Sequence, residues 1–157
     1  MADIFISYSK QDQQEAWLLA GFLEAEGYSV WWDRSFLDGE NFRNVIITEL
    51  GRARAALVVW SENSVRSDEV QSEAGRAHAE HKLIPVKARD LARKDIPPPF
   101  DSMQIESLDD QEKILAAVVA QLAKPEIRPS APLQLSKTAW FKLLSWFRTV
   151  GAGLRRT

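Results

Sequence analysis

The hydrophobic positions along the chain alternate between short strand-like runs and longer helical stripes. Ile4-Phe5-Ile6 has the β-branched and aromatic character of a strand, and the nearly continuous apolar run 55–60 indicates a strand covered on both faces, as in a parallel sheet. Apolar residues between them recur at helical spacing from 17 to 23, after Asp12 as a predicted N-cap. Further strands are predicted at 28–32, 83–86 and 103–105, and further helices at 45–53, 67–77 and 109–122.

This alternation predicts a doubly wound α/β domain with a five-stranded parallel sheet flanked by helices, covering residues 1–124. Pro85 has no N–H to donate, which places the strand 83–86 near a sheet edge or places Pro85 near a strand end. Prolines then mark a linker at 125–136. The last segment, 137–157, is a basic aromatic tail in which one predicted amphipathic helix carries Trp140, Leu143, Leu144, Phe147 and Val150 on a single stripe.

Charge divides the chain in the same way. The whole chain of 157 residues has a net charge of −2, but residues 1–124 carry 14 Lys and Arg against 21 Asp and Glu, and residues 125–157 carry six against one. An acidic body argues against nucleic acid as a partner, because phosphate binding needs clustered Lys and Arg. For residues 137–150 the basic and aromatic pattern fits a partner's hydrophobic groove, the start of a further segment, or a membrane surface.

The chain has no cysteine, which excludes a disulfide scaffold, a thiolate metal site and a Cys nucleophile. It also has no apolar run near 18 residues and no signal-peptide pattern, so a cytoplasmic location is expected, with membrane association through the tail as the alternative. Gly39 lacks the following Gly-Lys of a P-loop, and no GxSxG motif is present. His78 and His81 have no evident third ligand, so no metal site is predicted.

Polar groups follow three of the predicted strands, at the edge where open parallel sheets bind their ligands. They are the segments 7–10, 33–42 and 61–73. The strands that lead into the first two segments read Asp3-Ile4-Phe5-Ile6-Ser7-Tyr8-Ser9 and Gly27-Tyr28-Ser29-Val30-Trp31-Trp32-Asp33. Together with the loop 33–42 and with Ala55-Ala56-Leu57-Val58-Val59-Trp60-Ser61, these blocks resemble the Toll/interleukin-1 receptor (TIR) domain over residues 2–124, and especially its bacterial members.

The resemblance implies a flavodoxin-like fold, self-association with other TIR domains and, as in many bacterial members, cleavage of the nicotinamide–ribose bond of NAD+. NAD+ is then a substrate, and no cofactor is expected. Glu73 matches the glutamate that is essential in catalytic members. The chemistry is consistent with one carboxylate, because nicotinamide leaves as a neutral molecule without an acid and the carboxylate has only to stabilise the ribosyl cation.

The resemblance also implies substrate-binding residues around Glu73. Ring-bearing positions of the family are matched by Phe5, Tyr8 and Phe42, acidic positions near the ribose or adenosine by Asp33 and Asp38, and basic positions by Ser9 and Lys10, of which only Lys10 is a cation. Glu69 stands where many catalytic members have Trp. It precedes Glu73 by one helical turn, so repulsion between the two carboxylates is expected to raise the pKa of one of them.

Two functions follow from the resemblance. The first is an NAD+ nucleosidase in bacterial signalling or defence, activated when the loop 33–42 of one protomer helps to form the pocket of another. The second is an interaction module without activity, which uses the same loop to dock other TIR domains as an adaptor or effector.

Overall fold

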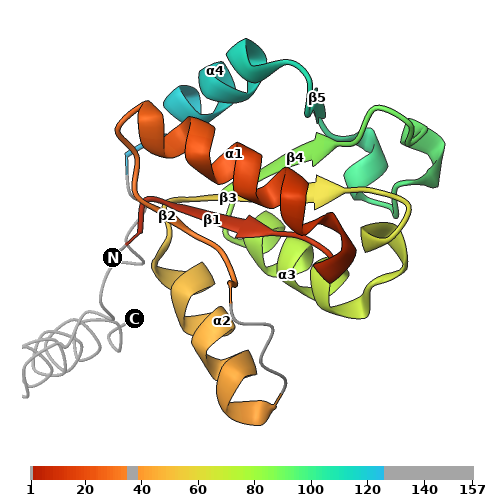
Figure 1. Cartoon of the computed structure of the whole chain (residues 1–157), viewed down its shortest axis with the longest axis horizontal. Coiled ribbons are helices and arrows are strands. Elements are labelled where there is room, and N and C mark those ends of the chain that lie inside the picture. The colour runs from red at the N-terminus through yellow and green to blue at the C-terminus, as the bar shows by residue number, and fades with distance from the viewer. Residues whose placement is uncertain (1, 35–38, 126–157) are drawn as a thin grey trace, which may run out of the picture. The chain divides into compact units, whose positions relative to one another are not determined.

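A five-stranded parallel sheet forms the middle layer of the fold (Figure 1). In the computed structural model, which describes residues 2–34 and 39–125, the strands lie in the order β2-β1-β3-β4-β5. They are β1 at Ile4–Ser7, β2 at Val30–Trp31, β3 at Ala55–Trp60, β4 at Leu83–Lys87 and β5 at Glu106–Ser107. This order is flavodoxin-like, and it confirms the predicted fold class.

Four α-helices of the described residues cover the two faces of this sheet. They are α1 at Gln13–Ala25, α2 at Glu40–Arg52, α3 at Asp68–Ala79 and α4 at Gln111–Leu122. Short 3₁₀ turns occupy Lys10–Asp12, Ser64–Arg66, Arg93–Asp95 and Phe100–Ser102. None of the helices in this described part is long and apolar enough to cross a membrane. The predicted linker beyond Pro125 and the predicted tail helix lie outside the described residues.

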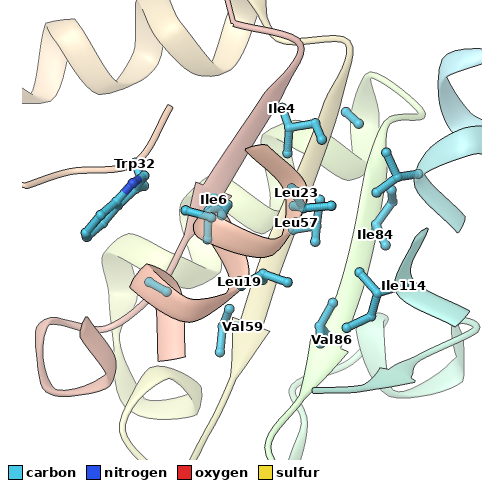
Figure 2. Close-up of a cluster of buried hydrophobic side chains, with 14 residues drawn as sticks. Ile4, Ile6, Leu19, Leu23, Trp32, Leu57, Val59, Ile84, Val86 and Ile114 are labelled. Carbon is cyan, nitrogen blue, oxygen red and sulfur yellow. The ribbon is translucent and has the colours of Figure 1, made fainter. Parts of the chain in front are cut away.

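The core has one cluster on each face of the sheet. Ile4, Ile6, Leu57 and Val59 pack against α1 and α4 on one face (Figure 2). Phe5, Val58 and Trp60 pack against α2 and α3 on the other. Side chains of a strand alternate between its two faces, so burial on both sides accounts for the continuous apolar run of β3, all six of whose residues are buried.

Two helix starts show what the sequence could and could not indicate. Ser67 caps α3 as predicted, because its hydroxyl accepts the Val70 N–H at 3.3 Å. Asp12 occupies the N-cap position of α1, but its carboxylate makes no capping bond. It accepts instead from the hydroxyl of Ser61 and from Asn63 Nδ2, the latter at 3.1 Å. The predicted capping role of Asp12 is therefore wrong.

One strand prediction needs correction. The last strand, predicted at 103–105, is β5 at Glu106–Ser107, since only these residues pair with β4. β4 lies near the sheet edge as predicted, between β3 and the edge strand β5. Pro85 has a strand partner only on the β3 side, opposite Val58, because the pairing with β5 begins at Val86. The missing N–H is therefore tolerated where β4 is locally an edge.

Candidate active site

The candidate site lies at the carboxyl ends of β1 and β2 and on α3, close to the point where the sheet's winding reverses between β1 and β3. The charges of Asp33 and Glu73 act on the Tyr8 hydroxyl, and the charges of Glu69 and Asp33 act on the Glu73 carboxyl. The structure thus brings together four predicted site residues from three separate parts of the chain.

Glu73 lies in the middle of α3, beside the buried stripe formed by Val70, Ala74 and Ala77. Its position at the margin of this stripe leaves the side chain only partly exposed. Burial is the main cause that raises the pKa of Glu73, to about 7; the Ser7 hydroxyl lowers this pKa, and the charges of Glu69 and Asp33 raise it. The carboxyl is therefore present in both protonation states near neutral pH, which is typical of groups that act in catalysis.

Glu69 acts on Glu73 in the direction expected from the sequence, but it is not the main cause. Its side chain is exposed at the start of α3, one turn before Glu73. Water screens an exposed charge, so its repulsion contributes less to the pKa of Glu73 than burial does.

Tyr8 connects the end of β1 to the segment after β2. Its hydroxyl donates a hydrogen bond to the backbone carbonyl of Asp33, and its ring lies 6.0 Å from the Trp32 ring at an angle of 59°. Burial raises the pKa of Tyr8 to about 12, with smaller contributions from the charges of Asp33 and Glu73. The phenol therefore stays protonated, and Tyr8 serves as a neutral donor.

The other predicted ring positions differ in their surroundings. Phe5 is 1% exposed and stacks on Trp31, with ring centroids 5.1 Å apart and planes inclined by 10°. This places the Phe5 ring in the core beneath the site. Phe42 is partly buried on α2 and lines a hollow of about 330 Å³ together with Val30, Trp31, Trp32, Asp33 and Arg34. Asp38 lies outside the described residues.

Ser9 and Lys10 follow Tyr8 at the rim of the site. Ser9 is buried, and its hydroxyl donates to the side-chain carbonyl of Gln11. Lys10 is exposed at the start of the turn Lys10–Asp12.

Asp33 belongs both to the hollow of about 330 Å³ and to the charged cluster. It lines the hollow, and its charge raises the pKa of Glu73. A larger hollow of about 800 Å³ runs along α1 and is lined by residues that include Trp17, Leu18, Phe22 and Trp32. Glu73 lines neither hollow.

Sequence reasoning placed Ser7 among the polar residues at the strand ends without giving it a role, and it missed the buried polar network of Asp12. Ser7 ends an otherwise apolar strand and is 2% exposed, and the alternation of β1 puts it on the face of the sheet that α3 covers. The signal that could have identified Ser7 is a polar residue at a strand position whose side chain is expected to be buried. Asp12 is 6% exposed and joins the end of β1 to the segment after β3 through Ser61 and Asn63.

Within residues 2–34 and 39–125 there is no group of three or more His, Cys, Asp or Glu side chains that could hold a metal ion.

Comparison with known proteins identifies the fold. The family model described as "TIR domain" matches residues 4–123. The comparison with curated protein sequences gives no match.

Solved structures similar to this chain are also TIR structures. A metazoan TIR-STING receptor from C. gigas, in complex with 2′,3′-cGAMP, is 21% identical with a TM-score of 0.64 over 80% of this chain, which spans only 40% of that protein. The TIR domain of the Toll-related receptor TRR-2 from Hydra magnipapillata is 17% identical with a TM-score of 0.66, over 79% of this chain and 100% of that domain. TIR domains of the activated Roq1 resistosome, which recognises the pathogen effector XopQ, are 21% identical with a TM-score of 0.50, over 94% of this chain and 100% of theirs.

Proposed function

Because this chain belongs to the TIR-domain family, we propose that it is an NAD+ nucleosidase in which Glu73 is the catalytic carboxylate. The observation that carries the proposal is the setting of Glu73: a partly buried carboxyl among Tyr8, Asp33 and Glu69, with a pKa raised to about 7 mainly by burial. Perturbed carboxyls in such clusters occur preferentially at functional sites.

The reaction needs the ionised form of Glu73. The bond between C1′ of the ribose and the pyridinium nitrogen breaks, the electron pair goes to nicotinamide, and water adds to C1′ with release of one proton. Positive charge develops on the ribose in the transition state, and a carboxylate held in a partly buried site stabilises that charge more strongly than it would in water. The rate should therefore rise with pH as the Glu73 carboxyl ionises.

The neighbouring residues have proposed roles in binding. Phe42 and Asp33 line one hollow, so an aromatic group of the substrate would lie against Phe42 while Asp33 faces a ribose hydroxyl. Asp38 has the same proposed role as Asp33. Lys10 would face a phosphate beside Ser9, and Glu69 would contribute negative charge near the pyridinium.

Phe5 contributes indirectly, because its stack with Trp31 fixes the strand from which Asp33 follows.

Self-association is part of the proposed function. We expect the loop 33–42 of one protomer to complete the pocket of another, so that activity rises with protein concentration. The similar proteins include two receptors and a resistosome that recognises a pathogen effector, and a role in signalling or defence is proposed for this chain as well.

The test is release of nicotinamide from NAD+ by the purified chain, followed by chromatography at low and high protein concentration. Glu73→Gln should abolish release, whereas Glu112→Gln, an exposed glutamate in the first turn of α4, should leave it unchanged. Full activity of Glu73→Gln would refute the assignment of Glu73.

A second candidate is an interaction module without catalysis. It is favoured by the exposure of Trp17 and Leu18 on α1, at 61% and 54%, because large exposed apolar side chains that adjoin one another mark interaction sites. A chain that assembles at high concentration yet releases no nicotinamide would favour this module over the enzyme.

A further inference from the structure

The Ser7 hydroxyl is a buried polar group with no partner at good hydrogen-bond geometry in the described part of the chain. Ser7 is 2% exposed. Backbone pairing holds Ser7 on the β3 side, where it lies opposite Val58, whereas the pairing of β1 with β2 ends at Phe5 opposite Trp31. The Ser7 backbone therefore cannot shift without breaking its pairing with β3.

The alternation of β1 directs this hydroxyl to the α3 side of the sheet. Ile4 and Ile6 belong to the core cluster under α1 and α4, whereas Phe5 belongs to the cluster that contains Val70, Ala74 and Ala77 of α3. Ser7 follows Phe5 by two positions and thus shares its face. Glu73 lies between Val70 and Ala74 on α3, and the Ser7 hydroxyl lowers its pKa.

Stability alone does not account for a serine here. A buried hydroxyl without a well-aligned partner loses its bonds to water and gains little in return, so the folded chain would be at least as stable with alanine. The position belongs to an otherwise apolar strand, IFIS, in which a small apolar residue would fit the pattern. The hydroxyl has one evident purpose in this environment, which is its action on the carboxyl beside it.

We propose that Ser7 is a positioning residue, whose hydroxyl, held by the pairing of β1 with β3, orients the Glu73 carboxylate from the face of the sheet that α3 covers. This deepens the proposed function and rests on it. The charges of Glu69 on α3 and Asp33 after β2 raise the pKa of Glu73. The charge of Glu73 in turn raises the pKa of Tyr8, which follows β1. The Ser7 hydroxyl shifts the pKa of Glu73 in the direction opposite to the carboxylates of Glu69 and Asp33.

The test compares Ser7→Ala with Ser7→Thr, which keeps the hydroxyl, and with Ser72→Ala, an exposed serine next to Glu73 in sequence. Carbon-13 NMR of the glutamate carboxyl carbons follows the titration of Glu73, whose signal is assigned by its absence in Glu73→Gln. In Ser7→Ala the midpoint should rise by about half a pH unit or more. It should stay near the wild-type value in Ser7→Thr and in Ser72→Ala.

Activity gives the second readout. The rising limb of nicotinamide release against pH should move by the same half unit in Ser7→Ala, so that the rate near pH 6 falls about threefold relative to the rate near pH 8.5. At pH 5, where Glu73 is protonated with or without the Ser7 hydroxyl, the melting temperature of Ser7→Ala should be unchanged or higher.

An unmoved Glu73 midpoint in Ser7→Ala would overturn the proposal, and so would a melting temperature several degrees lower at pH 5, since a merely structural hydroxyl predicts that loss. If the wild type releases no nicotinamide, the proposed function fails, but the NMR midpoint still decides whether Ser7 sets the state of Glu73.

Discussion

The hydroxyl of Tyr8 donates to the backbone carbonyl of Asp33 and thereby joins the ends of the neighbouring strands β1 and β2. Tyr8→Phe removes this bond and keeps the ring against Trp32. We expect a loss of about 1 kcal/mol in the free energy of unfolding, measured by urea titration. Nicotinamide release should fall more than this loss of stability accounts for, because Asp33 is no longer held beside Glu73.

The matched control is Tyr28→Phe, at the opposite end of β2, where the ring packs against the core. Its effect on nicotinamide release should be small. Equal activity of Tyr8→Phe and the wild type would contradict a role for the Tyr8–Asp33 bond in the site.

The raised pKa of Glu73 makes stability depend on pH. Because the native state keeps the Glu73 proton up to about pH 7, whereas the unfolded state loses it near 4.5, the native state binds more protons between these values. The contribution of Glu73 to stability therefore decreases as pH rises from about 4.5 to about 7. Glu73→Gln does not titrate and should be more stable than the wild type at pH 8, by at most about 3 kcal/mol.

This difference should shrink towards zero near pH 4.5. Urea unfolding of both proteins at the two pH values measures it, and the subtraction cancels the other carboxylates of the chain. A difference that is the same at both pH values would show that the carboxyl of Glu73 is not strained by burial.

Lys82, just before β4, forms hydrogen bonds to backbone carbonyls at the end of α2. It is 6% exposed, its ammonium donates to the backbone carbonyls of Leu50 at 2.6 Å and Ala53 at 3.1 Å, and it pairs with Glu80 at 2.5 Å. Lys82→Met keeps the aliphatic stem and leaves these buried carbonyls without their donor, at an expected cost of about 2–3 kcal/mol. Lys94→Met, on an exposed lysine, should change the free energy of unfolding by less than about 0.5 kcal/mol.

For the basic aromatic tail, a membrane surface is the alternative that ranks after a partner protein or a further segment, and vesicle binding tests it. Co-sedimentation with vesicles of phosphatidylcholine and phosphatidylserine should retain the full chain more strongly than a chain lacking residues 126–157. The difference should diminish at high salt, because exposed charges are then screened. Equal sedimentation of the two chains would exclude a membrane role for the tail and favour a partner protein.

The elements with strong local signals could be predicted from sequence. The six apolar residues of β3 require cover on both faces, and Ser67 before two acidic residues is a strong helix start; the structure confirms both. β5 was misplaced because a strand of two residues is defined by its pairing with β4 and not by its own composition. Pattern alone could not show this.

Long-range contacts explain the other differences. Asp12 has the local signature of a cap, but Ser61 and Asn63, about fifty positions away, compete for its carboxylate. Phe5 matches a ring-bearing position of the family, but in this chain the Trp31 ring stacks on the face of the Phe5 ring. Glu73 could be predicted from the family resemblance, whereas the degree of burial that raises its pKa depends on how α3 packs against β1.

Ser7 lies where β1 pairs with β3, whereas Asp33 follows the two-residue strand β2. Substitutions at Asp33 would change which molecules are admitted without altering the backbone pairing that holds the end of β1. Selectivity could then evolve separately from reactivity, since the residues that would set each are attached to different parts of the framework.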